Sequence, residues 1–200
     1  VASRGLGDVY KRQEWHRLLE AAVARDGDSA HWLAWLHLGV MRFRNGDPDG
    51  AKSAWRASIA AQPTAWAYRN LAHLAMAAEP QANDEIDACV ELWTTASRLN
   101  PDLVPLAVEA AKALLHLGQV QALVRFVRQL PAAVQAQPRI RLLRAQAALT
   151  IGTDDEMRLI EQFFAGDNKI ANIREKEVSL SELWFGWQAN RREQVLGRSL

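Results

Sequence analysis

Apolar residues recur at helical spacing along most of the chain, and this pattern indicates the class of fold. The spacing, with breaks at glycine and proline, predicts helices over 14–25, 30–45, 48–61, 65–78, 83–99, 102–117, 119–130, 138–151, 153–165 and 179–189. No segment shows the regular alternation of apolar and polar residues that is typical of a half-buried strand. The sequence therefore predicts an all-α protein.

The first thirteen residues depart from this pattern. Val1–Gln13 contains two glycines and a basic pair and has no apolar period. From Ser3 onward it can be encoded by a string ending in AGATGTGTATAAGAGACAG, which resembles the end of a transposase-based sequencing adapter. We interpret the segment as non-native and expect it to contact the body little. Glu14 is then expected to be the first native residue of the C-terminal part of a longer protein. The alternative is a flexible arm with a basic tip at Lys11 and Arg12.

A repeated set of residues begins at Trp35. The first copy has the order W-x2-L-G, then glycine, alanine, an aromatic residue and proline, carried by Trp35, Leu38, Gly39, Gly46, Ala51, Trp55 and Pro63. A second copy, with an insertion in the segment EPQAND, is carried by Leu71, Ala72, Ala75, Cys89, Trp93, Ala96 and Pro101. Two weaker copies are marked by Gly118 and Gly152, which lie 34 residues apart. Over about Glu14 to Ala165 the pattern resembles the tetratricopeptide repeat, a helix–turn–helix unit of 34 residues, although Arg42 stands where that repeat usually has tyrosine.

This resemblance implies a right-handed α-solenoid of tetratricopeptide-like hairpins over residues 14–165. Small residues are expected where the two helices of a hairpin cross, at Gly39, Ala72 and Ala111. Large residues on the second helices are expected to fill the gap to the next hairpin, at Trp55 and Trp93. Glycines in the left-handed conformation are expected to end first helices, at Gly46, Gly118 and Gly152.

The tail carries helix signals of its own. Ser179 and Glu182 have the spacing of a capping box, and Val178 and Leu183 have that of the accompanying hydrophobic staple. One apolar stripe follows, formed by Leu180, Leu183, Trp184 and Trp187. We expect 166–200 to comprise an irregular linker and a capping helix over 179–189, docked on the last repeat near Leu149, Leu159, Ile160 and Phe163. The alternative is a docking helix for another chain.

The register of the repeat also predicts a concave face built from the first helix of each hairpin. That face is lined by Leu33, Leu36, Val40, Phe43, Trp66, Arg69, His73, Met76, Val108, Lys112, Leu115, Arg139, Leu142 and Gln146. The candidate peptide-binding groove within it consists of Phe43, Trp66, Arg69, His73, Lys112 and Arg139. An apolar floor with spaced cations suits an extended or helical segment that carries an acidic group. The alternative is a face that is solvated or covered by the chain itself.

Composition and motifs favour binding over catalysis. The net charge is +1, but the first thirteen residues contribute +2, so the remainder carries −1 and has no electrostatic footprint for nucleic acid. The single cysteine, Cys89, excludes an internal disulfide and is expected to be an inert core residue. Asp47 in NGDPDG is expected to cap a helix, because the twelfth position of a calcium loop there would be Ser58 rather than glutamate. No apolar run is long enough to span a bilayer. We therefore expect no catalytic residue, no metal or cofactor, no nucleic-acid or membrane partner, and a cytoplasmic location.

Three further segments resemble the C-terminal part of large bacterial proteins of an uncharacterised family. They are WAYRNLA at 66–72, NIRE at 172–175 and SELWF at 181–185. In that family a mutarotase-like β-sandwich with a carbohydrate-active character precedes helical repeats, so any sugar chemistry would belong to an upstream domain. Two functions stay open: a scaffold that binds a peptide or a subunit in its concave groove, or a structural appendage that packs against the upstream carbohydrate-active domain of its own chain.

Overall fold

The computed structural model describes residues 2–27, 30–166 and 180–197, with side chains from Gln13 to Arg192 within those ranges. The described residues form helices and connecting turns, without a strand. The helices are α1 (Ala2–Asp26), α2 (Trp32–Arg44), α3 (Pro48–Ala61), α4 (Ala65–Ala77), α5 (Asn83–Leu99), α6 (Val104–His116), α7 (Val120–Gln129), α8 (Ala132–Gln135), α9 (Pro138–Ile151), α10 (Asp154–Ala165) and α11 (Leu180–Gly197). The predicted class, an all-α helical-repeat solenoid, is confirmed.

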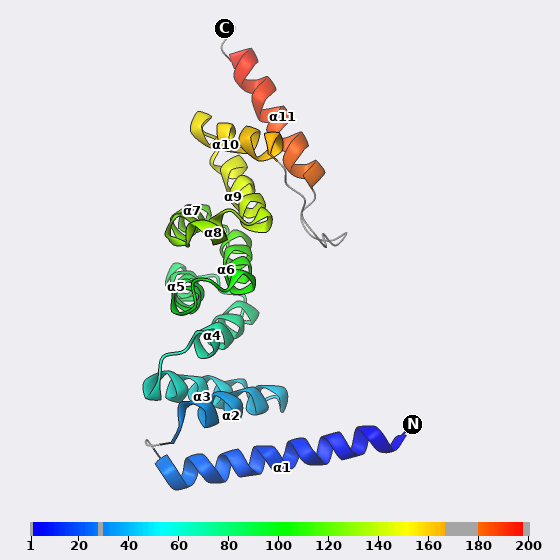
Figure 1. Cartoon of the computed structure of the whole chain (residues 1–200), viewed down its shortest axis with the longest axis vertical. Helices are drawn as coiled ribbons and strands as arrows, with labels where there is room; N and C mark the ends of the chain where they lie inside the picture. Colours follow the sequence, from blue (N-terminus) through cyan, green and yellow to red (C-terminus); the bar gives the residue numbers. More distant parts are fainter. Residues whose placement is uncertain (1, 28–29, 167–179, 198–200) are drawn as a thin grey trace. The chain divides into compact units, whose positions relative to one another are not determined.

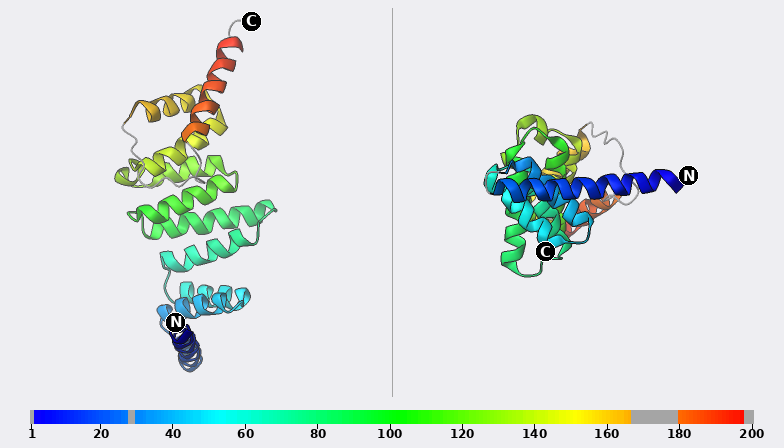
Figure 2. Two further views of the ribbon diagram at one scale, coloured as in Figure 1. Left: turned by 90° about the vertical axis from the view of Figure 1, so that its right-hand side faces the viewer. Right: turned by 90° about the horizontal axis from the view of Figure 1, so that it is seen from below.

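The chain divides into two compact units, Val1–Asn100 and Pro101–Leu200. The first unit holds α1 and the hairpins α2–α3 and α4–α5, and the second holds the hairpins α6–α7 and α9–α10 with α8 and α11. Within each unit the helices follow one another in a stack (Figures 1 and 2). Each hairpin packs its own two helices together, and α3 also contacts α4 while α9 contacts α6 and α7.

The first hairpin confirms the predicted crossing of helices at a glycine. A Cβ atom at Gly39 would lie 2.3 Å from Nε1 of Trp55, so α2 and α3 approach closely only because residue 39 has no side chain. Trp55 Nε1 donates to the carbonyl of Leu36 at 3.2 Å. The indole of Trp55 also belongs to a buried cluster with Ala67 and Leu71 of α4, so it fills the gap to the next hairpin as predicted.

Left-handed residues end the first helices of the hairpins. Gly46, Gly118 and Gly152 have φ of 81°, 68° and 76°, as the repeat pattern predicts. The second repeat has no glycine at this place, and Glu79, the residue after the C-cap of α4, adopts φ of 51°. A side chain in this conformation is strained because its Cβ crowds the backbone. The turn geometry of the repeat is therefore imposed on Glu79 by the packing of α4 and α5.

The helices depart most from the prediction in three places. Helix α1 begins at Ala2 rather than near residue 14, because the first segment contains no proline and its two glycines cost only about 1 kcal/mol each in a helix. The side chains of 2–12 lie outside the described residues, so the non-native origin of Val1–Gln13 stays a prediction. A short helix, α8, lies between Pro131 and Pro138, and its Val134 is buried. Helix α11 continues to Gly197, beyond the predicted end at residue 189.

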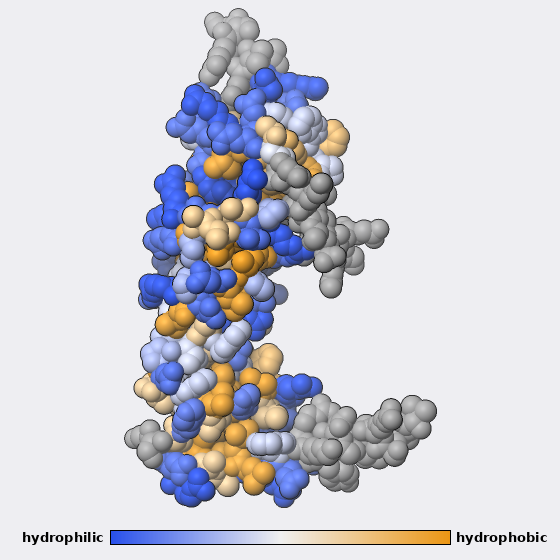
Figure 3. Space-filling model, in the orientation of Figure 1, coloured by the Kyte–Doolittle hydropathy of each residue, from blue (hydrophilic) through white to orange (hydrophobic). Residues whose placement is uncertain are grey.

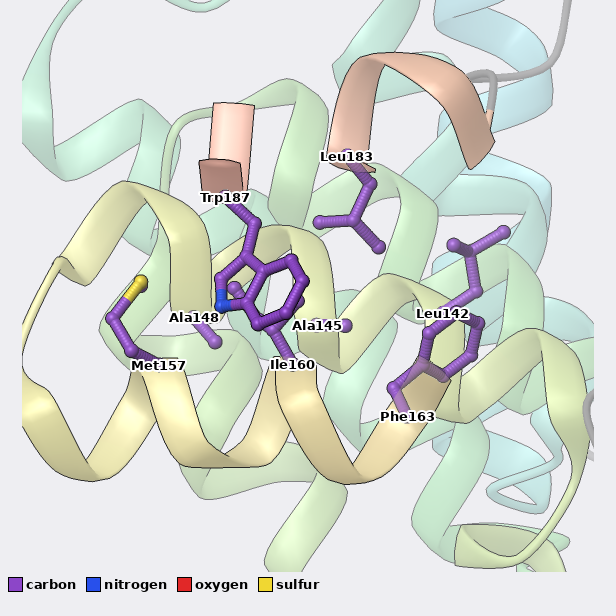
Figure 4. Close-up of a cluster of buried hydrophobic side chains, with 8 residues drawn as sticks. All are labelled: Leu142, Ala145, Ala148, Met157, Ile160, Phe163, Leu183 and Trp187. Atoms are coloured by element: carbon purple, nitrogen blue, oxygen red, sulfur yellow. The ribbon is translucent and has the colours of Figure 1, made fainter. Parts of the chain in front are cut away.

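One apolar cluster joins α9, α10 and α11 in the second unit. Its buried members are Leu142, Ala145, Ala148, Met157, Ile160, Phe163, Leu183 and Trp187. Leu183 and Trp187 project from α11 toward the two other helices (Figure 4). Leu149 and Leu159, two residues where the sequence predicts docking, are partly buried against the same cluster.

The apolar stripe of α11 is buried only in part. Trp184 is 40% exposed, whereas Leu183 and Trp187 are 1% and 7% exposed. Trp184 therefore packs on the last repeat without being buried, and its ring lies in a T-shaped arrangement with that of Phe164 of α10 at a centroid distance of 5.0 Å. The predicted cap at Ser179 and the staple at Val178 lie outside the described residues.

Candidate functional site

Helix α4 presents three of the six predicted groove residues on one face. Trp66, Arg69 and His73 follow one another at intervals of three and four residues, the spacing at which helical side chains are neighbours. The helix begins after Pro63, and the hydroxyl of Thr64 accepts a hydrogen bond from the amide of Ala67 at 3.5 Å. The local sequence therefore fixes where α4 begins. Trp66 is the second residue of this helix.

The opposite face of α4 is buried and holds the helix in place. Ala65, Ala67, Leu71 and Ala72 are each at most 7% exposed. Ala67 and Leu71 pack with Trp55 of α3, and Cys89 Sγ of α5 lies 3.9 Å from the carbonyl of Ala72. Because α4 is held between neighbours, the exposed face has a defined direction.

Two aromatic side chains of the predicted groove are exposed to solvent. Trp66 is 46% exposed and Phe43, on α2, is 48% exposed. Phe43 lies with its ring centroid 6.0 Å from that of Trp55. His73 is exposed but its ring packs edge-on against the buried Trp93 at 4.7 Å, and Arg69 is partly buried. Apolar residues are also visible on the surface over α1 to α3 of this unit (Figure 3).

The remaining two predicted groove residues belong to the second unit. Lys112 is exposed on α6, and Arg139 is partly buried in the first turn of α9. The groove as a single surface with Phe43, Trp66, Arg69 and His73 therefore stays a prediction, and the first unit alone holds four of its six residues.

Several residues assigned to the wider concave face are buried instead. Leu36, Val108, Leu142 and Gln146 are 7–8% exposed, so they cannot offer much surface to a partner. Leu36 lies in the cluster around Trp55, and Leu142 lies in the cluster shared with α11. The repeat register gives the direction of a side chain but not the depth to which a neighbouring helix covers it, and this is why these assignments fail.

The residues weighed for chemistry have structural roles. Asp47 caps α3 and its carboxylate accepts from the amide of Gly50 at 2.8 Å, as predicted. Cys89 is fully buried, and burial raises the pKa of its thiol. A raised pKa leaves less thiolate at neutral pH and therefore opposes nucleophilic chemistry.

In the part of the chain that the structure describes, no three His, Cys, Asp or Glu side chains gather as metal ligands do. None of the described helices has the length and apolar character needed to cross a membrane.

Sequence reasoning missed one feature of the second unit, a cleft of about 490 Å³ between α7, α8, α9 and α10. It is lined by Val127, Arg128, Ala132, Gln135, Ala136, Arg141, Arg144, Leu159, Gln162 and Phe163. The available signal was the pair Arg141 and Arg144, which lie three residues apart on α9 and therefore on one side of the helix.

Comparison with known proteins identifies no family for this chain. No protein-family model matches the sequence. No curated protein matches it either. Among solved structures, a thermophilic tetratricopeptide-repeat protein of Thermus thermophilus is similar at 17% identity, with a TM-score of 0.46 and 93% of each chain covered.

Proposed function

We propose that the chain is a non-catalytic protein-interaction scaffold that binds a peptide or a protein subunit on the face of its first helices. The observation that carries this proposal is the exposed aromatic surface of α4 and α2 in the first unit. Trp66 and Phe43 keep almost half of their surface in solvent, although each sits on a helix whose other side is packed in the core.

An exposed tryptophan on a fixed helix is suited to recognition. Tryptophan is strongly enriched among the residues that dominate binding energies at protein interfaces. Its rigid ring loses little conformational entropy when a partner covers it. Because packing already defines the direction of α4, binding at Trp66 would require little reorganisation of the scaffold.

The charge of the face favours an acidic partner. Arg69 lies one turn from Trp66, and Lys112 and Arg139 carry the same charge on the corresponding helices of the second unit. Guanidinium groups bind carboxylates through paired charge-assisted hydrogen bonds. The proposed ligand is therefore an extended or helical segment in which an apolar side chain meets Trp66 and a carboxylate meets Arg69.

A peptide-display selection against the whole chain, followed by titration of the selected peptide, tests this proposal. Trp66→Ala is expected to weaken binding about thirtyfold, the loss for a residue of central importance at an interface, and Arg69→Glu is expected to weaken it further for acidic peptides. Trp15→Ala is the matched control, because Trp15 is 60% exposed on another helix, and Arg56→Glu is the matched control for the charge.

Equal affinity of Trp66→Ala, Arg69→Glu and the parent for every selected peptide would remove this face as the recognition surface. If no peptide is selected but a mutarotase-like upstream domain, added separately, binds with the same dependence on Trp66 and Arg69, the face packs against that domain, and the appendage function replaces the scaffold.

A further inference from the structure

The cleft between α7 and α10 has a composition that points to a ligand. Ten residues line it, and three of them are arginines, Arg128, Arg141 and Arg144, with no acidic side chain among the ten. Its volume of about 490 Å³ lies within the range of ligand-binding pockets. Arg139, the predicted groove residue on the same helix α9, does not line this cleft, so the two surfaces differ.

One of the three arginines is already neutralised. Arg144 is only 8% exposed and makes a paired contact with Glu156 of α10, with N–O distances of 2.5 and 2.7 Å. This ion pair fastens α9 to α10 at the inner wall of the cleft. Arg144 therefore contributes rigidity to the wall, and its charge is not available to a ligand.

The other two arginines bring uncompensated charge to the cleft. Among the described residues, neither Arg128 nor Arg141 forms an ion pair with a carboxylate. Arg141 donates only a long hydrogen bond, 3.5 Å, to the carbonyl of Gln162, and its guanidinium lies 5.8 Å from the centre of the Phe163 ring. A guanidinium held against an aromatic ring keeps its orientation and its unused donors. Arg141 of α9 and Arg128 of α7 thus bring two guanidinium groups from different helices to one cleft, a combination that suits a carboxylate.

The rest of the lining is mostly apolar. Leu159 of α10, Ala132 of α8 and Ala136 directly after α8 give the cleft its accessible apolar surface, and the buried Val127 and Phe163 lie beneath it. A free inorganic anion would leave this apolar surface in contact with water, whereas a carboxylate that carries an apolar neighbour covers it. We propose that this cleft binds a peptide through a carboxylate at Arg128 and Arg141 and through the adjacent apolar side chain on the surface of Leu159, Ala132 and Ala136.

The carboxylate can come from an acidic side chain or from a chain end, and short peptides separate these sources. Acetyl-leucyl-aspartyl amide offers only the side chain, and acetyl-leucyl-leucine offers only the chain end. Their uncharged partners are acetyl-leucyl-asparaginyl amide and acetyl-leucyl-leucine amide. Each is titrated into the whole ¹⁵N-labelled chain while the arginine Nε–H signals are followed by NMR, with variants Arg128→Gln and Arg141→Gln for assignment and Arg125→Gln as the matched control. Arg125 is exposed on α7 and does not line the cleft.

We expect at least one acidic peptide to shift the signals of Arg128 and Arg141, and its uncharged partner to bind about tenfold more weakly or not at all, the usual effect of losing a charge-assisted hydrogen bond. Arg141→Gln is expected to weaken binding by a similar factor and Arg125→Gln to leave it unchanged. Equal binding of charged and uncharged peptides, or the absence of shifts for both acidic peptides, would overturn the proposal. The same holds if Arg125→Gln weakens binding as much as Arg141→Gln, because the attraction would then be non-specific. The scaffold proposal is tested separately at Trp66, so either can fail alone.

Discussion

Adding one methyl group at Gly39 is expected to destabilise the first hairpin. The new Cβ would lie 2.3 Å from Nε1 and 2.5 Å from Cδ1 of Trp55, whereas unstrained contacts between carbon atoms are about 3.5–4.0 Å. The contact atoms belong to a rigid ring that is 3% exposed, so they cannot rotate away as the end of a flexible side chain would. The indole would have to move by about 1 Å or more.

The magnitude follows from three terms of different sign. Overpacking of a well-packed core costs about 1–3 kcal/mol. Displacing the ring also weakens the hydrogen bond from Trp55 Nε1 to the carbonyl of Leu36, for about 1 kcal/mol. Replacing glycine by alanine inside a helix returns about 1 kcal/mol. Gly39→Ala should therefore lower the free energy of unfolding by about 1–3 kcal/mol, although alanine is the better helix former.

Urea unfolding followed by circular dichroism measures this change, and Trp55→Leu completes a double-mutant cycle. A leucine at position 55 removes the ring that residue 39 would strike. Gly39→Ala should then cost about 1–2 kcal/mol less in the Trp55→Leu background than in the parent. If the two substitutions add within about 0.5 kcal/mol, the close contact between Gly39 and Trp55 is not what makes the alanine unfavourable.

Four other outcomes are expected. Glu79→Gly should raise the free energy of unfolding by about 0.5–1 kcal/mol, because glycine relieves the left-handed strain at φ of 51°. A lower free energy of unfolding than that of the parent, measured with urea, would contradict this. Leu183→Ala should lower the free energy of unfolding by about 2–5 kcal/mol. Phe185 lies on the same helix but is 70% exposed, so Phe185→Ala should change this free energy by less than about 0.5 kcal/mol. Equal effects would mean that α11 does not dock through Leu183. Cys89 should react with iodoacetamide far more slowly in the folded than in the urea-unfolded chain, since burial raises the pKa of its thiol; equal rates would mean that the thiol is accessible. Deleting Val1–Gln13 should leave the thermal midpoint unchanged, and a fall of several degrees, equivalent to about 1 kcal/mol or more, would refute its non-native origin.

The helices could be predicted from the sequence because their signals are local. Pro48 and Asp47 start α3, Gly152 ends α9, and in both cases the predicted and observed boundaries agree within a residue. Helix α8 was missed because four residues between two prolines are too few to show a helical period. The left-handed Glu79 was missed because nothing in its own side chain favours that conformation, which packing around the turn imposes.

The candidate site could be predicted less completely because exposure depends on neighbours. The repeat register predicted Trp66 and Phe43 on the first-helix face, and both are exposed. It predicted Leu36 and Gln146 on the same face, and both are buried. It did not predict the cleft at Arg141, which depends on how α8 fills the space between α7 and α9. Periodicity gives direction around one helix, but burial and cavities arise from several helices together.

The most direct test of the scaffold proposal is ¹⁹F NMR of the chain labelled with 5-fluorotryptophan, recorded while an acidic peptide from the display selection is added. Eight signals are expected, one for each tryptophan, and Trp66→Phe assigns the one that matters. The account predicts that the signal of Trp66 shifts and saturates with the peptide, while those of the buried Trp55 and Trp187 stay in place. A saturating peptide that leaves Trp66 unchanged and shifts the exposed Trp15 or Trp184 instead would contradict it.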